Sequence, residues 1–100
     1  MDRNMRWFAM PVSLQISNIG SEVARAIKYK DRDDNEKAAR FCQKAIDLWM
    51  LTMEDPKNGH RKGEFSFAVE ELQDYFLGEN KYGTDNLMLS KYYDAFVLRA

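Results

Sequence analysis

The sequence predicts an all-helical fold, an antiparallel four-helix bundle formed by a single domain spanning residues 1–100. Apolar residues recur at the i, i+3, i+4, i+7 spacing of an amphipathic helix, and short polar or Gly- and Pro-containing segments separate these stretches. No stretch keeps the apolar and polar alternation of a strand, and one hundred residues are enough for one core. The helices are expected at residues 13–30, 34–54, 61–77 and 86–99.

The first twelve residues are the hardest to assign. Trp7 and Phe8 are too apolar for a solvated tail, so residues 1–12 are expected either to be poorly ordered or to pack against the helices or a partner. Pro11 favours a helix start immediately after it. In the helix at 13–30, Ile16, Ile19, Val23, Ala26 and Ile27 share one side. Gly20 with Ala24 forms a smooth strip that would let another helix approach closely.

The segment 34–54 is predicted to be the central helix. Phe41, Ala45 and Leu48 define one apolar face, and Met50 helps extend it to a second side, so this helix should contact more than one neighbour. Three polar residues at its start are candidate N-caps, namely Asp33, Asp34 and Asn35. Pro56 must end the helix near Glu54.

The two C-terminal helices follow the same pattern. The inward face of 61–77 is predicted to hold Phe65, Ala68, Val69, Leu72, Tyr75 and Phe76. In 86–99, Leu89, Phe96 and either Tyr92 or Tyr93 should point inward, with Leu87 as a further candidate. Thr84, Asp85 or Asn86 would cap this last helix.

Composition limits the classes of function. The formal net charge is −1, so the whole molecule has no electrostatic attraction to nucleic acid or membrane. The halves differ, because residues 1–62 hold 12 Lys/Arg and 9 Asp/Glu whereas residues 63–100 hold 3 and 7. One cysteine excludes an internal disulfide, and no 18-residue apolar stretch or signal peptide is seen. A cytoplasmic location is therefore expected.

No catalytic or metal-binding residues are predicted, and no cofactor is expected. His60 is the only histidine and lies in a turn with Pro56 and Gly59, while Cys42 lies on the apolar face of the central helix. A Glu-x-x-His pair, which a di-metal helical bundle requires, does not occur. The sequence favours a protein that is not an enzyme.

Two groups of residues are candidate binding sites. Arg25, Lys28, Lys30 and Arg32 lie near Tyr29 at the end of the first long helix and could contact phosphate, or they could simply be solvated beside the neighbouring aspartates. The aromatic residues are also too many for one small core. Tyr29, Trp49, Tyr75, Tyr92 and Tyr93 therefore either line the edge of the core or form a protein interface, for which a homodimer is the simplest form.

Three stretches, SNIGSEVARAIKYK, KAIDLWMLTMEDPKN and GENKYGTDNLMLSKYYDAFVLRA, resemble a family of small uncharacterised bacterial proteins. These proteins share a Gly-Ser-Glu-Val-x-Arg-Ala first helix, a DPKN turn and a late helix rich in Tyr and Phe. The resemblance covers most of residues 13–100 and implies no function.

The stretch AARFCQKAID also resembles, more distantly, the second helix of HEPN domains, the higher eukaryote and prokaryote nucleotide-binding helical bundles. Such domains accompany nucleotidyltransferases or act as ribonuclease toxins, and the ribonucleases carry Arg, then four to six residues, then His. The matching positions before His60 are Met53, Glu54 and Asp55, so the ribonuclease motif is not present.

Two hypotheses follow. The first is a non-enzymatic protein-interaction module that self-associates or binds a protein partner. The second is a HEPN-like module that binds nucleotide or RNA, or that accompanies a nucleotidyltransferase.

Overall fold

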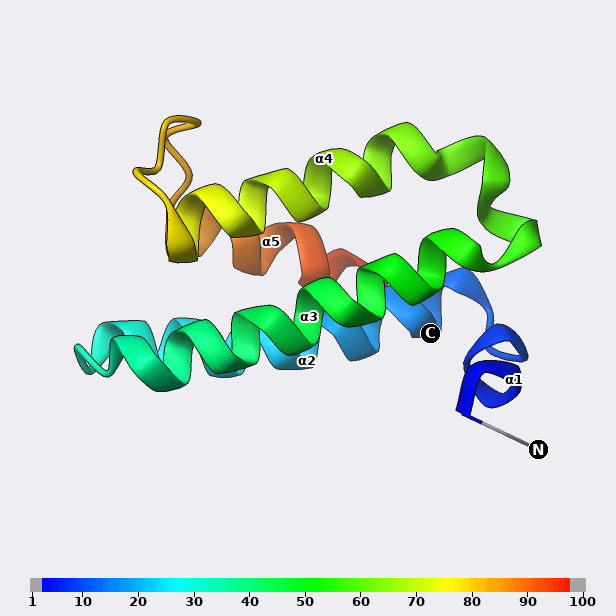
Figure 1. Cartoon of the computed structure of the whole chain (residues 1–100), viewed down its shortest axis with the longest axis horizontal. Helices are drawn as coiled ribbons and strands as arrows, with labels where there is room; N and C mark the ends of the chain where they lie inside the picture. Colours follow the sequence, from blue (N-terminus) through cyan, green and yellow to red (C-terminus); the bar gives the residue numbers. More distant parts are fainter. Residues whose placement is uncertain (1–2, 98–100) are drawn as a thin grey trace.

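The computed structural model describes the backbone of residues 3–97 and the side chains of residues 4–97. The all-helical prediction is confirmed, and the described residues contain no strand. The chain forms five α-helices with a 3-10 turn and a π-helical turn between them (Figure 1). In order, these are α1 (Arg3–Phe8), α2 (Val12–Asp31), α3 (Asn35–Glu54), η1 (Pro56–Arg61), α4 (Lys62–Leu72), η2 (Gln73–Leu77) and α5 (Asn86–Val97).

The predicted ranges differ from these bounds in three places. Residues 61–77 are not a uniform α-helix, since their last turn, η2, is π-helical and a 3-10 turn over Pro56–Arg61 precedes α4. Residues 98 and 99 of the predicted last helix lie outside the described residues. The N-terminal segment adds α1, a helix that was not predicted.

Carboxylates fix the starts of two helices, as expected from the sequence. The Asp34 side chain accepts a hydrogen bond from the backbone N–H of Lys37 at 3.1 Å and caps α3. The Asp85 side chain accepts from the N–H of Met88 at 2.8 Å at the start of α5. Asp33 completes the tight α2–α3 connection with a positive φ of 58°, a conformation that Asp tolerates better than most residues.

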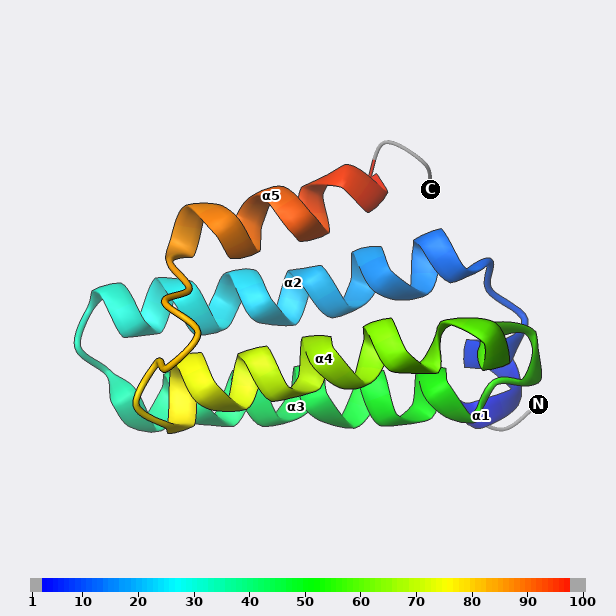
Figure 2. The ribbon, with the colours of Figure 1, turned by 90° about the horizontal axis from the view of Figure 1, so that it is seen from above.

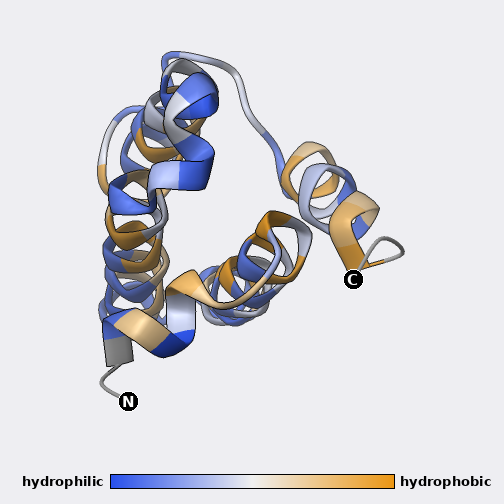
Figure 3. Ribbon diagram, turned by 90° about the vertical axis from the view of Figure 1, so that its right-hand side faces the viewer, coloured by the Kyte–Doolittle hydropathy of each residue, from blue (hydrophilic) through white to orange (hydrophobic). Residues whose placement is uncertain are grey.

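Helix α3 packs against more elements than any other helix, as predicted for the segment 34–54. It lies along α2 and also contacts α4, both short turns and α1, while α5 packs mainly against α2 (Figures 1 and 2). Figure 3 shows that the helices carry hydrophobic residues on one side and hydrophilic residues on another. The amphipathic pattern read from the sequence therefore places α3 at the centre of the contacts.

The core contains most of the residues predicted to be inward. Trp49 is fully buried and contacts the rings of Phe65 and Tyr93, with centroid distances of 4.9 Å and 6.2 Å. Two predictions are wrong, because Met50 and Leu87 are exposed. About half of the Met50 side chain, and more of the Leu87 side chain, is left uncovered by the neighbouring helices.

Gly20 allows α5 to approach α2, which confirms the predicted close contact of a second helix. A Cβ atom at this position would lie 2.8 Å from the Cβ of Tyr93 and 3.3 Å from its Cγ. No side chain larger than hydrogen fits at that distance without a shift of α5.

The N-terminal segment packs on the chain itself from residue 4 onward. Trp7 is buried, and its indole Nε1 donates a hydrogen bond to the Thr52 hydroxyl of α3 at 2.9 Å. Of the arrangements expected for residues 1–12, packing of the segment against the helices is therefore the one observed around Trp7. Residues 1 and 2 lie outside the described part of the chain.

Candidate functional site

The four predicted cationic residues do not form one group. Arg25, Lys28 and Arg32 follow i, i+3, i+7 spacing and share an exposed side of the helix end, where Arg25 Nη1 pairs with Glu22 at 2.7 Å. Lys30 points away from them. Its Nζ lies 4.5 Å from the centre of the Tyr75 ring and 3.5 Å from the Tyr75 carbonyl oxygen.

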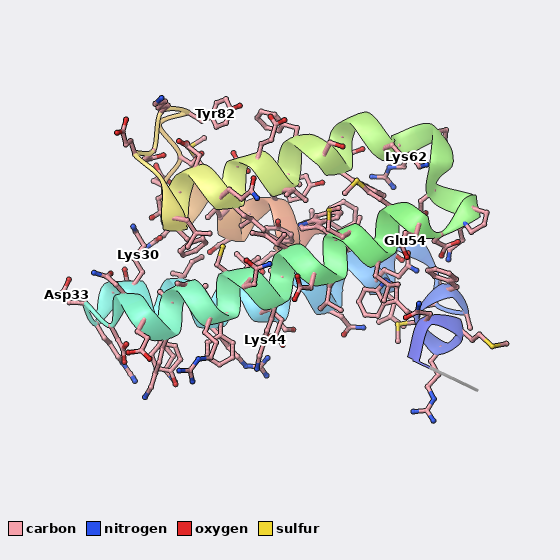
Figure 4. The ribbon with its side chains drawn as sticks, viewed as in Figure 1. Lys30, Asp33, Lys44, Glu54, Lys62 and Tyr82 are labelled. Atoms are coloured by element: carbon pink, nitrogen blue, oxygen red, sulfur yellow. The ribbon has the colours of Figure 1, made fainter. Side chains whose placement is uncertain are left out.

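The side of α2 and α3 near Arg25 also carries two stacked rings that the sequence did not place together. Tyr29 and Phe41 lie 5.5 Å apart with their planes 6° from parallel. Lys37 Nζ is 5.3 Å from the Tyr29 ring, and Lys44 Nζ is 4.8 Å from the Phe41 ring (Figure 4 labels Lys44). These four residues are called the stacked-ring face below.

Acidic residues offset the positive charge of this face. Lys37 lies 3.9 Å from a carboxylate oxygen of Asp34, and Arg40 lies 3.3 Å from one of Glu36. Both pairs are solvent-exposed and so contribute little to stability. The local charge is mixed rather than strongly basic.

The aromatic residues predicted as an interface belong mostly to the core. Trp49, Tyr75 and Tyr93 are buried within the single chain and present almost no surface to a partner, so of the two alternatives left open by the sequence they fit core packing. Their polar atoms find partners inside the protein, which is why they are accommodated there. Tyr75 donates to Asn86, and Trp49 donates to Tyr93.

Tyr92 and Tyr29 are half-buried and keep part of their rings at the surface. The Tyr92 hydroxyl donates to Glu64 Oε1 at 2.9 Å. Burial first, and then the hydrogen bond to the Glu64 carboxylate, raise the pKa of Tyr92 strongly. Tyr92 therefore remains a neutral donor that holds the Glu64 side chain in place.

Exposed apolar side chains gather instead on α4, α5 and the loop between them. Phe67, Tyr82, Leu87 and Met88 are each between 49% and 62% exposed, and the Phe67 and Tyr82 rings meet edge-on at 5.3 Å. Tyr82 projects from the loop at the outer side of α4 (Figure 4). From the sequence, Phe67, Leu87 and Met88 were not predicted to bind a partner.

A groove of about 240 Å³ runs between α4 and α5. We call it the α4–α5 groove, and its lining residues are Glu64, Phe67, Ala68, Glu71, Met88 and Tyr92. The backbones of α4 and α5 approach less closely than those of α2 and α5.

Carboxylates flank this groove and are held by hydrogen bonds. Glu64 accepts from Arg61 Nε at 3.1 Å and Nη2 at 3.0 Å, and the hydrogen bond to Arg61 lowers the pKa of Glu64. Glu71 accepts from the Thr84 hydroxyl at 3.1 Å, and Glu70 accepts from the Tyr82 hydroxyl at 3.3 Å. These contacts fix negative charges beside the exposed apolar residues.

A second groove, of about 460 Å³, lies between α3 and α4. Its walls are Met50, Met53, Val69, Ser66, Glu54, Lys62 and Glu70. Figure 4 shows Glu54 and Lys62 on the two helices that bound it. Its lining mixes methionines with charges of both signs, and this mixture points to no single ligand chemistry.

A buried polar cluster joins α2, the end of α3 and η1. Gln15 Nε2 donates to the Trp7 carbonyl at 2.8 Å and to Asp55 Oδ2 at 3.0 Å. Asn58 Nδ2 donates to Gln15 Oε1 at 3.0 Å and to the Thr52 carbonyl at 3.1 Å. Since these side chains are satisfied within the protein and buried, the cluster is structural.

Lys57 closes the cluster on its solvent side. Its Nζ donates to the Phe8 carbonyl at 2.9 Å and pairs with the Asp55 carboxylate. The DPKN stretch singled out in the sequence thus anchors α1 to η1. No sequence pattern indicated that Gln15 and Asn58 would be buried together.

Both Cys42 and His60 occupy the surroundings expected from the sequence. Cys42 is buried, burial raises the pKa of its thiol to about 12, and its Sγ donates to the Leu72 carbonyl at 3.7 Å. His60 is exposed on η1.

Within residues 3–97, no group of three or more His, Cys, Asp or Glu side chains is placed to hold a metal ion. In the same part of the chain, every helix is too short or too polar to cross a membrane.

The chain matches no protein-family model, and no curated protein and no solved structure is significantly similar to it.

Proposed function

We propose that this protein is a non-enzymatic protein-interaction module that binds its partner through the α4–α5 groove. The observation that carries this proposal is the set of half-exposed apolar side chains beside one groove. Phe67 and Met88 line the groove, and Tyr82 contacts Phe67. Adjoining exposed apolar residues of this kind are typical of binding surfaces, whereas isolated ones are ordinary.

The size of these side chains is sufficient for a binding site. Burying a fully exposed large apolar side chain contributes about 1.5–3 kcal/mol, so Phe67, Tyr82 and Met88, each about half exposed, offer a few kcal/mol together. Aromatic and Met side chains are also the types enriched at interfaces. The buried state of Cys42 and the exposed position of His60 support the non-enzymatic part of the proposal.

A photocrosslinking residue placed in the groove tests this proposal. Benzoylphenylalanine at position 67 or 88 should form covalent adducts in cells, whereas the same residue at exposed position 36 of α3 should not. Equal adduct yields at positions 67 and 36 would show that the groove has no dedicated partner.

The mass of the adduct also identifies the type of partner. An adduct of twice the chain mass indicates the homodimer expected from the sequence, and light scattering of the purified protein should then give a dimer that Phe67→Asp dissociates. An adduct with another protein indicates a heterotypic complex. The HEPN resemblance implies a nucleotidyltransferase-like protein as one such partner.

The stacked-ring face favours a second candidate function, the binding of single-stranded RNA. Parallel rings flanked by lysines are a surface on which bases stack while phosphates meet cations. A fluorescent RNA oligonucleotide should bind at low salt, lose affinity as salt rises, and bind more weakly to an Arg25→Glu, Lys28→Glu double variant. Absence of binding at low salt would eliminate this candidate.

For the architecture, we propose that α2, α3, α4 and α5 form an antiparallel four-helix bundle. The reversal of chain direction between successive long helices in Figures 1 and 2 supports this proposal.

A further inference from the structure

We propose that the α4–α5 groove accepts a basic amphipathic helix of another protein, with apolar residues facing the groove and Lys or Arg flanking them. This inference rests on the proposed function and specifies the partner. It is argued from the shape of the groove, its apolar walls and the charges around it.

The shape of the groove suits a helix. The lining residues of α4, namely Glu64, Phe67, Ala68 and Glu71, follow i, i+3, i+4, i+7 spacing, and Met88 and Tyr92 of α5 follow i, i+4. The walls are therefore two rows that run along the helix axes, the α4 row for two turns, or about 10 Å, and the α5 row for about one turn. A third helix laid between such rows buries one side chain per turn, which is how amphipathic helices bind grooves.

The walls of the groove combine a side chain held in place by a hydrogen bond with one that can change its conformation. Tyr92 is held by its hydrogen bond to Glu64, and the small Ala68 side chain lets a partner approach α4 closely. Phe67 and Met88 stand at the mouth, about half exposed. Met has an unbranched, polarisable side chain that adjusts to the shape of its partner.

The acidic residues around the α4–α5 groove indicate that the bound helix is basic. Residues 63–97 contain seven acidic and two basic residues. Among the described residues, neither Glu70 nor Glu71 has an ion-pair partner within 4.0 Å, although each accepts a hydrogen bond from a hydroxyl group. A helix bearing Lys or Arg beside its apolar residues would complement these carboxylates. Exposed pairs of this kind contribute about 0.2–1 kcal/mol each, so they select the partner more than they set the affinity.

The same charges disfavour two other occupants. If two copies packed groove to groove, the carboxylates of Glu70 and Glu71 of one chain would face those of the other across the two-fold axis. A nucleic acid would bring phosphates to those carboxylates. Both arrangements place like charges together, and this opposes binding.

Two synthetic peptides test the inference. Each carries leucines at i, i+3, i+4, i+7 spacing, one with lysines and one with glutamates at the other positions, and binding is measured by fluorescence anisotropy. We expect the lysine peptide to bind at least tenfold more tightly than the glutamate peptide, a difference of about 1.4 kcal/mol. Binding should weaken as salt is raised, because exposed charges are screened.

Variants of the protein locate the binding site. Phe67→Ala and Glu71→Lys should each weaken binding of the lysine peptide by about fivefold or more, whereas two matched controls should not. Met50→Ala removes an apolar side chain as exposed as Phe67 but on α3, and Glu36→Lys reverses an exposed charge on α3. Circular dichroism is used to check that all four variants remain helical.

The outcomes separate this inference from the proposed function. Equal binding of both peptides, equal loss in variants and controls, or no binding would overturn the basic-helix partner. If crosslinks at position 67 nevertheless join two copies, the groove is an interface between copies and only the present inference fails. If position 67 gives neither crosslinks nor peptide binding, both proposals fail.

Discussion

The indole Nε1 of Trp49 donates a hydrogen bond to the hydroxyl oxygen of Tyr93 across 3.1 Å, inside the core. This bond joins the central helix α3 to the last helix α5. The rings of the same two residues pack against each other, and both side chains are buried. Loss of one partner would leave a buried polar atom unsatisfied, so the pair should be important for stability.

Tyr93→Phe should lower the free energy of unfolding by about 1–2 kcal/mol, because the buried Trp49 N–H loses the Tyr93 hydroxyl as its acceptor while the ring still fills its site. Urea denaturation followed by circular dichroism measures the change. Tyr82→Phe is the control, since Tyr82 is exposed and should alter stability little. An equal effect of the two substitutions would mean that the buried bond has no special weight.

Gly20→Ala should destabilise the protein even though Ala is the better helix former. The new Cβ would lie 2.8 Å from the Cβ of Tyr93, so α5 must move, and overpacking of this kind costs about 1–3 kcal/mol. Gly63→Ala, with nothing within 4 Å of the new Cβ, should instead raise stability by up to about 1 kcal/mol. Thermal unfolding of both variants compares them, and a stabilised Gly20→Ala protein would contradict the close approach.

Asp55 should make stability depend on pH. Burial tends to raise the pKa of its carboxyl, but hydrogen bonds from Lys57 and Gln15 together outweigh burial and lower it. A carboxyl with a lowered pKa in the folded state stabilises the protein at pH above its unfolded value, about 3.9, and this contribution is lost as pH falls through the folded pKa.

Asp55→Asn should therefore cost about 1–3 kcal/mol near neutral pH, and the difference from the unmodified protein should shrink below about pH 4. Urea midpoints at neutral and acidic pH measure it. Asp94→Asn, at an exposed position on α5, should show no comparable change. A difference that is independent of pH would show that the charge of Asp55 is unimportant.

The Cys42 thiol should react slowly with Ellman's reagent in the folded protein. Burial raises its pKa to about 12, so almost no thiolate exists at pH about 8, and solvent does not reach the sulfur. Full reaction is expected in guanidinium chloride. Rapid reaction of the native protein would require frequent opening between α3 and the end of α4, where Cys42 contacts the Leu72 carbonyl.

The helical pattern was predictable because it depends on local spacing. Apolar periodicity located Ile16, Ala45 and Leu72 on inward faces, and all three are fully buried. Asp34 and Asp85 were recognisable as capping residues by the same local logic. The position of Gly20 also indicated a close helix contact, which the structure confirms.

Features that depend on contacts between distant segments were not predictable. Gln15, Thr52 and Asn58 look polar in the sequence, yet they are buried because each satisfies another across the ends of separate helices. For Trp49 and Tyr93 the sequence left both the edge of the core and an interface open, because the hydrogen bond that pairs them inside the core joins residues far apart in the chain. Phe67 and Met88 gained a candidate role only when folding placed α4 beside α5.

The two tryptophans provide separate optical reporters of the fold. Trp7 is buried where α1 meets Thr52, and Trp49 is buried among the aromatic rings of the core. In a Trp49→Phe protein the remaining indole emission follows detachment of the N-terminal helix, and in a Trp7→Phe protein it follows loss of the interior. Comparing the two emission curves during denaturation would reveal whether the N-terminal helix leaves before the interior melts, without attaching a dye to the chain.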